Sequence, residues 1–301
     1  MSFWFFYFFK VFFRKIFFKV NTPILGGFKL THRCNLRCYH CPFWGRTGKE
    51  LSFAEVKNIL DKMHEMGVRI MIFEGGEPFL WQDGDKDIRD VVNYAKKKYF
   101  SVGITTNGTL SMKGIPSDVL WVSFDGMRET YSKIRGDVFD RIVKNIDESD
   151  HKNLYANITI NRINESELEE MVKFLSEKVK GITIQFHYPY GGEEDKELFI
   201  PLTERIGILD RLINLKKAGY PVMDTYKALN LMKNNDWKCH DWLIANANPD
   251  GTVSQGCYIK NRGEVNCQYC GFAAHAEISL GFDLHFPSIN MGRKIFKYRT
   301  I

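Results

Sequence analysis

The stretch ILGGFKLTHRCNLRCYHC, residues 24–41, joins an apolar segment with β-strand character to a short loop that carries three cysteines. Cys34, Cys38 and Cys41 follow a C-x3-C-x2-C spacing. Iron–sulfur clusters are normally closed by four cysteines, and a metal site that lacks one protein ligand leaves a position open for substrate. The spacing therefore predicts a reactive four-iron cluster with one open iron.

The cysteine loop could also hold zinc or form disulfide bonds. His32 or His40 could supply a fourth ligand and complete a zinc site. Disulfide bonds are disfavoured because the chain has seven cysteines, an odd number, and we expect no cleavable secretory signal. We therefore expect a reducing compartment.

Three further motifs follow successive strand-like segments. EGGEP stands at 74–78, TTNG at 105–108 and SFDG at 123–126. Adjacent glycines let a backbone approach a ligand with no Cβ in the way. Glycine and Asx turns that merely end strands are the structural alternative. Because chemistry in parallel barrels lies at the carboxyl ends of strands, the three motifs are expected to meet at one site.

Taken with the cysteine triad, these motifs resemble those of the radical S-adenosylmethionine (SAM) superfamily. The resemblance implies that the open iron chelates the amino and carboxylate groups of SAM, and that an electron from the cluster cleaves SAM to a 5′-deoxyadenosyl radical. His40 departs from the family pattern, in which an aromatic residue usually precedes the third cysteine, but imidazole can still stack on adenine. The residues implied at the cofactor are His40, Gly75, Gly76, Glu77, Asn107, Ser123, Asp125 and Asn161.

Strand-like and helix-like segments alternate along residues 24–218, which predicts a parallel sheet with right-handed crossovers. Ser52 and Glu55 form a capping box before one helix and Gly67 ends it. Six such units are fewer than a closed barrel needs, and the resemblance implies an α/β, partial (β/α)6 TIM-like barrel. The expected strands are 24–30, 69–73, 102–105, 120–124, 154–160 and 182–186. The expected helices are 53–66, 87–99, 137–146, 166–178 and 203–218.

The remaining four cysteines lie in the last quarter of the chain, at Cys239, Cys257, Cys267 and Cys270. They resemble the SPASM or twitch extension, which implies a second, fully ligated [4Fe-4S] cluster. A structural zinc held by the same four thiolates is the alternative. The sequence PDG at 249–251 predicts a hairpin turn between the first two of these cysteines.

The first twenty residues, MSFWFFYFFKVFFRKIFFKV, are rich in phenylalanine, and their four charges are all positive. On a helix, those cations fall within about half of the circumference. The pattern is typical of an interfacial helix, and its uncharged runs are too short to span a bilayer. Packing onto the barrel or a second subunit is the alternative. We expect a helix at 1–22, a barrel at 23–200, and a helix plus four-cysteine region at 201–301.

These observations favour a radical SAM enzyme with an electron donor such as ferredoxin or flavodoxin. The N-terminal helix suggests a membrane-lipid substrate and a cytoplasmic protein peripheral to the inner face of the membrane. Two alternatives are a peptide- or small-molecule-modifying enzyme and a non-catalytic Fe–S or zinc protein. Although the net charge is +6, no continuous basic and aromatic surface for nucleic acid is evident.

Overall fold

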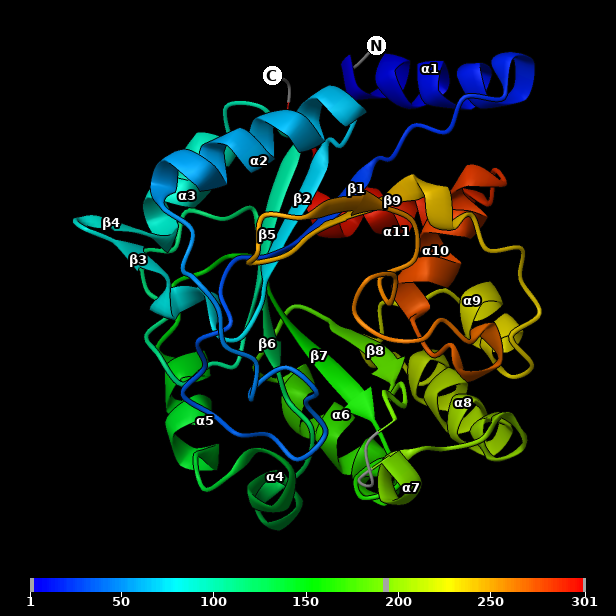
Figure 1. The fold of residues 1–301 in the computed structure, drawn as a ribbon. Helices are drawn as coiled ribbons and strands as arrows, with labels where there is room; N and C mark the ends of the chain where they lie inside the picture. Colours follow the sequence, from blue (N-terminus) through cyan, green and yellow to red (C-terminus); the bar gives the residue numbers. More distant parts are fainter. Residues whose placement is uncertain (1–2, 192–194, 300–301) are drawn as a thin grey trace.

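The computed structural model describes residues 3–191 and 195–299, and these form a curved α/β sheet covered by helices (Figure 1). Its eight strands follow the order β10-β9-β1-β2-β5-β6-β7-β8. Six of them pair in parallel from β1 to β8, as the alternation of segments predicted. Their bounds are Leu25–Lys29 (β1), Ile70–Glu74 (β2), Ser101–Thr106 (β5), Val119–Ser123 (β6), Leu154–Ile160 (β7) and Ile182–Phe186 (β8).

Helices cover the outer face of this sheet, and the main hydrophobic core lies between them and the strands. The capping box expected before the first covering helix is present, and Gly67 ends that helix at a φ of 113°. The two ends of α2 are therefore fixed by local capping interactions as well as by burial of its apolar face. The covering helices are α2 (Phe53–Met66), α3 (Ile88–Ala95), α5 (Phe139–Asp147), α6 (Leu168–Ser176) and α8 (Leu202–Lys217).

Two helices of the barrel differ from expectation, and the helices after residue 218 were not predicted. Helix α3 ends at Ala95 rather than at residue 99, because its apolar stripe stops there and three lysines follow. Helix α4 (Arg128–Arg135) was not predicted, since it is short and largely polar. The other elements are η1 (Pro78–Leu80), β3 (Gln82–Asp83), β4 (Lys86–Asp87), η2 (Glu165–Glu167), α7 (Asp195–Leu198), α9 (Tyr226–Met232), η3 (Asp241–Leu243), η4 (Cys267–Tyr269), α10 (Ala273–Phe282) and α11 (Phe286–Phe296).

The segment after residue 200 adds two strands to the barrel sheet. Strand β9 (Ile244–Ala247) pairs in parallel with β1, and β10 (Val253–Gln255) returns antiparallel to β9. The turn between them contains the predicted PDG sequence, with Gly251 at a φ of 84°. The C-terminal region is thus hydrogen-bonded to the barrel at its β1 edge.

Helix α1 (Phe3–Phe18) lies across the amino ends of the barrel strands. Its Tyr7 ring packs on Phe100, which directly precedes β5, and the Tyr7 hydroxyl donates to the Gly67 carbonyl ahead of β2. The first two residues of the expected helix lie outside the described residues. Within the described part of the chain, no helix has the length and apolar character needed to cross a bilayer.

Candidate active site

The cysteine loop follows β1 at the carboxyl end of the sheet. The Sγ of Cys34 accepts from the backbone N–H of Leu36 at 3.4 Å and from Nδ2 of Asn107 at 3.8 Å. The Cys41 N–H donates to the Cys38 carbonyl at 3.0 Å. Burial raises the pKa of the Cys38 thiol to about 11, and the neighbouring Cys34 and Cys41 act in the same direction. The three thiols therefore lie close enough to interact electrostatically.

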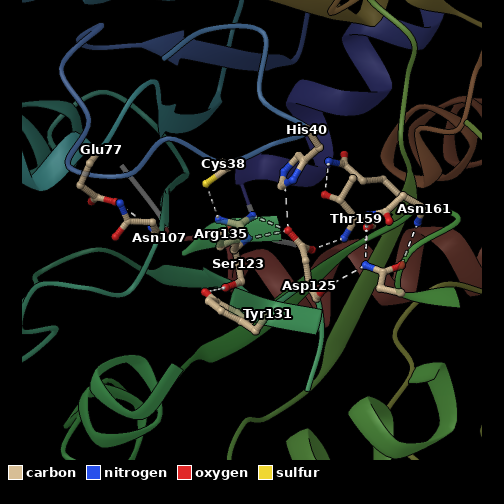
Figure 2. Close-up of polar contacts among 12 residues, drawn as sticks. Cys38, His40, Glu77, Asn107, Ser123, Asp125, Tyr131, Arg135, Thr159 and Asn161 are labelled. Atoms are coloured by element: carbon tan, nitrogen blue, oxygen red, sulfur yellow. Dashed lines mark hydrogen bonds and ion pairs between the residues drawn. The ribbon is translucent and has the colours of Figure 1, made fainter. Parts of the chain in front are cut away.

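Arg135 connects this loop to the fourth strand of the parallel series (Figure 2). Its Nε and Nη2 each lie 2.6 Å from Oδ2 of Asp125, and its Nη1 lies 3.9 Å from Sγ of Cys38. Both ionic side chains are almost fully buried. The Arg135 guanidinium lowers the pKa of the Cys38 thiol against the effect of burial. A buried cation beside a thiol favours the thiolate form, which is the form that binds metal.

Glu77 and Asn107 join the second and third strand ends. Oε2 of Glu77 accepts from the Asn107 N–H at 2.7 Å, and Oε1 accepts from the Thr106 hydroxyl at 2.8 Å. Burial raises the pKa of Glu77 to about 7. With these bonds inside the protein, the Glu77 carboxylate supports the loop at the ends of β2 and β5.

Gly75 and Gly76 lie against the cysteine loop, while their expected approach to SAM stays a prediction. Gly75 has a φ of 143°, and a Cβ on Gly76 would lie 2.1 Å from the carbonyl oxygen of Arg33 in the cysteine loop. The Gly76 N–H donates to the Thr31 carbonyl at 2.8 Å. In this structure the glycines therefore bring two loops together.

His40 lies over Asp125, with Nε2 3.6 Å from the carboxylate. Its Nδ1 is buried and has no hydrogen-bond partner among the described residues. Burial lowers the pKa of His40 to about 3, so the imidazole is neutral. A neutral ring with one free nitrogen at the site is compatible with stacking on, or bonding to, a bound molecule.

Ser123 and Asn161 lie at the ends of the fourth and fifth parallel strands. Ser123 ends β6, and its carbonyl accepts from the Tyr131 hydroxyl at 3.5 Å. Asn161 is buried in a turn, donating to the Thr159 carbonyl and accepting from the Ile163 N–H. Its side chain thus holds the backbone at the end of β7.

The four C-terminal cysteines form a second group, separate from the triad. Cys267 and Cys270 are joined by a turn in which the Cys270 N–H donates to the Cys267 carbonyl at 3.2 Å. Burial raises the pKa of Cys239 to about 11 and that of Cys270 to about 12, and in each the nearby thiols, Cys257 among them, add to the shift. The four thiols therefore lie within electrostatic range of one another, and their binding of one cluster stays a prediction.

In neither cysteine group do the thiols converge at the spacing of a metal site. Within residues 3–191 and 195–299, no three side chains from His, Cys, Asp and Glu converge at metal-binding spacing. The donor chemistry nevertheless fits iron–sulfur clusters, which take thiolates and are tuned by N–H groups directed at their sulfurs. Arg135 and Asn107 supply such groups to the triad.

Sequence reasoning missed a buried ionic cluster beside the cysteine loop. Nζ of Lys29 lies 2.7 Å from the Tyr258 hydroxyl and 3.8 Å from Glu74, which also pairs with Arg262 at 3.0 Å. Burial lowers the pKa of Lys29 to about 8. Alternation along β1 and β2 could have placed two of these on the inner face. The partners from residues 258–262 could be identified only from the three-dimensional fold.

Lys29 also borders a cavity of about 300 Å³ lined by His32, Phe43, Arg46, Thr47, Asn248, Asp250 and Asn261.

Fold and site together define a partial α/β barrel with a three-cysteine loop after its first strand. The sequence pattern of the Radical SAM superfamily matches residues 28–175. The chain belongs to the radical SAM superfamily, whose cofactors are a [4Fe-4S] cluster and SAM.

Relatives with described functions are diverse. The chain is 28% identical over 223 residues to Fe-coproporphyrin III synthase of Methanosarcina barkeri, covering 67% of this chain and 55% of that protein. It is 25% identical over 240 residues to mycofactocin maturase MftC of Mycolicibacterium smegmatis, covering 75% and 53%. The chain thus spans about half the length of these relatives.

Two solved structures share the fold. SuiB of Streptococcus suis bound to S-adenosylmethionine superposes with a TM-score of 0.63 at 14% identity, covering 84% of this chain and 65% of that one. Native anSMEcpe with bound AdoMet and a peptide gives a TM-score of 0.58 at 14% identity, covering 91% and 83%. At this identity the likeness establishes the fold, a partial barrel with a C-terminal extension.

Proposed function

We propose that the protein cleaves SAM reductively and directs the resulting radical to a peptide or another small, water-soluble molecule. One observation supports this most strongly: Asn107 and Arg135, from the third and fourth units of the barrel, both reach the sulfurs of the cysteine triad. The strand ends that would hold SAM and the thiols that would hold the cluster thus form one connected site.

Cys34, Cys38 and Cys41 would hold the cluster, which supplies the electron that cleaves SAM when both are bound. The chain's own residues position and enclose this chemistry. The buried Arg135–Asp125 pair fixes the end of β6 against the loop, because a paired and hydrogen-bonded ion pair has one well-defined geometry. Glu77 and Asn107 fix the ends of β2 and β5 in the same way.

The substrate side of the site is polar. Along β7 and β8, the Thr183 hydroxyl donates to Oδ1 of Asn157 at 3.0 Å, and Nε2 of Gln185 donates to the Thr159 hydroxyl at 3.1 Å. The cavity beside the cysteine loop is bordered by Lys29 and other polar side chains. An apolar lipid would remove water from these polar groups without bonding to them, whereas a peptide or polar metabolite can form further hydrogen bonds with them.

The position of the N-terminal helix disfavours the membrane-lipid substrate that its sequence suggested. That helix lies at the amino ends of the strands, so it does not contact the cysteine loop at their carboxyl ends. The named relatives and neighbours include a maturase, a tetrapyrrole synthase and a peptide complex. They support the peptide or small-molecule alternative better than a lipid substrate.

The four C-terminal thiols would hold an auxiliary [4Fe-4S] cluster, with zinc as the competing occupant. A closed site of this kind would pass electrons rather than bind substrate. An external donor of the ferredoxin or flavodoxin kind is proposed for the triad cluster, in a reducing compartment such as the cytoplasm.

The substrate class can be tested with cell extracts. Anaerobically reconstituted, reduced protein is given SAM together with either the water-soluble, low-mass and peptide fraction or the lipid fraction of the source cells. We expect the soluble fraction to increase 5′-deoxyadenosine formation and the lipid fraction to leave it unchanged. Stimulation by lipid alone would refute the proposed substrate class.

A further inference from the structure

Helix α1 has one face fixed to the barrel. Trp4 and Phe8 pack on Tyr298, with ring centroids 5.4 Å apart in both pairs, and Phe12 packs on Phe282 at 5.4 Å. Val11 is buried between them. The helix is therefore held in one orientation by the body of the protein.

The opposite face of α1 is apolar and uncovered in the described structure. Phe9 is 59% exposed and Phe17 is 65% exposed, and both lie beside Phe13, which is also exposed. Phe5, Phe6 and Ile16 extend this outward face along the helix. Soluble surfaces seldom leave so many neighbouring aromatic side chains in water.

The charges on α1 and just after it have one sign, and the two exposed ones, Lys10 and Lys19, lie beside the outward face. Lys10 and Lys19 are exposed, and Arg14 and Lys15 are partly exposed. The first twenty residues contain no Asp or Glu. Lys15 donates to Oδ1 of Asn21 and lies over the Trp242 ring at 4.8 Å, so it is held against the body of the protein. A partner surface must therefore be apolar and carry negative charge.

We propose that the outward face of α1 binds the surface of a bilayer that contains anionic lipids. Aromatic side chains would enter the boundary between headgroups and acyl chains while the exposed Lys10 and Lys19 contact the headgroups. A second copy of this chain fits less well, because symmetric pairing through α1 would bring the exposed Lys10 and Lys19 of both copies near one another, with no acidic residue on the helix to pair with them.

The position of α1 also fixes how the docked protein is oriented. Tyr7 and Phe8 contact Phe100 just before β5, and Gln255 at the end of β10 donates to the Asn21 carbonyl after the helix. All these contacts lie at the amino ends of the parallel strands. The cysteine loop follows their carboxyl ends, so a protein docked through α1 turns its candidate active site away from the bilayer (Figure 1).

Vesicle sedimentation of the full, reconstituted chain tests this proposal. Vesicles of equal parts phosphatidylglycerol and phosphatidylcholine are expected to bind the protein, and pure phosphatidylcholine to bind it much more weakly. The double substitution Phe9→Asp and Phe13→Asp should lower binding at least about tenfold, since both rings are on the exposed face. Lys10→Gln should lower it about fivefold, and added salt should weaken it further.

Trp44→Asp provides the matched control, because Trp44 is a comparably exposed aromatic residue in the cysteine loop at the far end of the barrel. It should bind vesicles like wild type, whereas a loss comparable with that of the double variant would refute the orientation. The proposal is overturned if wild type ignores anionic vesicles, or if it forms a dimer that the double variant abolishes while vesicle binding is absent. Unchanged far-UV circular dichroism and thermal unfolding establish that each variant is folded.

Discussion

At the scale of single residues, the site depends on how closely two loops approach. Gly76 lies against the backbone of Arg33, and the Glu77 N–H donates to the same Arg33 carbonyl at 2.8 Å. A backbone oxygen cannot move aside as a flexible side-chain end can. The absence of a side chain at Gly76 is therefore what allows the EGGEP turn to support the cysteine loop.

We expect Gly76→Ala to displace the cysteine loop, because the new Cβ would lie 2.1 Å from the Arg33 oxygen. Overpacking of this kind costs about 1–3 kcal/mol of stability, and SAM affinity should fall at least about tenfold for a misplaced site. Equilibrium binding of SAM to the reconstituted protein measures the effect. Gly45→Ala is the control in the same loop, since a Cβ there has no atom within 4 Å. Equal SAM affinity in the two variants would contradict this account.

Which residues stand at the strand ends could be predicted, but not what they contact. Asp125 was located because it follows a strand in an SFDG motif. Its partner Arg135 lies ten residues later in a helix that the sequence did not predict, and nothing local marks that arginine as buried. Arg162, which directly follows Asn161, pairs with Glu204 on α8 at 2.8 Å, and both side chains are exposed. Contact between these predicted cofactor residues and SAM remains a prediction.

At the scale of elements, helix α8 links the barrel to the second cysteine group. Arg205 is fully buried in α8 and donates to the carbonyls of Ile200, Tyr269 and Cys270 at 2.9, 3.2 and 2.6 Å. Its guanidinium also lies 4.7 Å from the centre of the Phe186 ring at the end of β8. One side chain thus holds the Cys267–Tyr269 turn against the sheet.

Arg205→Met should therefore loosen this turn. The Ile200 and Tyr269 carbonyls would lose a charged donor, at a cost of about 2–4 kcal/mol, whereas the Cys270 carbonyl would keep its bond from Nδ2 of Asn235. Metal analysis should find the C-terminal site depleted while SAM cleavage at the triad persists. Arg211→Met on the same helix is the control, because Arg211 pairs with Glu165 and Glu169 at a half-exposed position, where ion pairs contribute about 1 kcal/mol or less. Similar metal loss in both variants would argue against the role of Arg205.

Regular elements with strong local signals were predictable. Helix α2 has its predicted bounds because Ser52, Glu55 and Gly67 fix both ends, and β7 and β8 match because they are short apolar runs between turns. The pairing of β9 with β1 was not predicted, since it joins residues more than two hundred positions apart and no local pattern specifies such a register. The expected domain boundary at residue 200 placed β9 outside the barrel, so it did not predict this pairing.

At the scale of the whole molecule, buried acids make stability depend on pH. Burial, with Glu277 nearby, raises the pKa of Asp224 from 3.8 to about 7, although its carboxylate accepts from the Ile184 N–H at 3.1 Å. Between about pH 4 and 7 the folded chain keeps a proton that the unfolded chain has lost. Stability therefore falls as pH rises through this window, and Glu77 acts in the same direction.

Asp224→Asn should flatten this dependence, because an amide keeps the acceptor oxygen and has no charge to bury. The variant should gain up to about 4 kcal/mol relative to wild type between about pH 4 and 8. Anaerobic thermal unfolding of both proteins at several pH values measures the difference. If the difference in unfolding temperature between variant and wild type were the same at every pH in this range, Asp224 would not titrate as described.

The most direct test of the account is the formation of 5′-deoxyadenosine from SAM by reconstituted, reduced protein under anaerobic conditions, with Cys34→Ala and Cys267→Ala measured beside wild type. We predict that wild type forms 5′-deoxyadenosine, that Cys34→Ala forms none, and that Cys267→Ala still cleaves SAM but turns over substrate poorly. Unchanged SAM cleavage by Cys34→Ala would contradict the assignment of the cysteine triad and, with it, the proposed function.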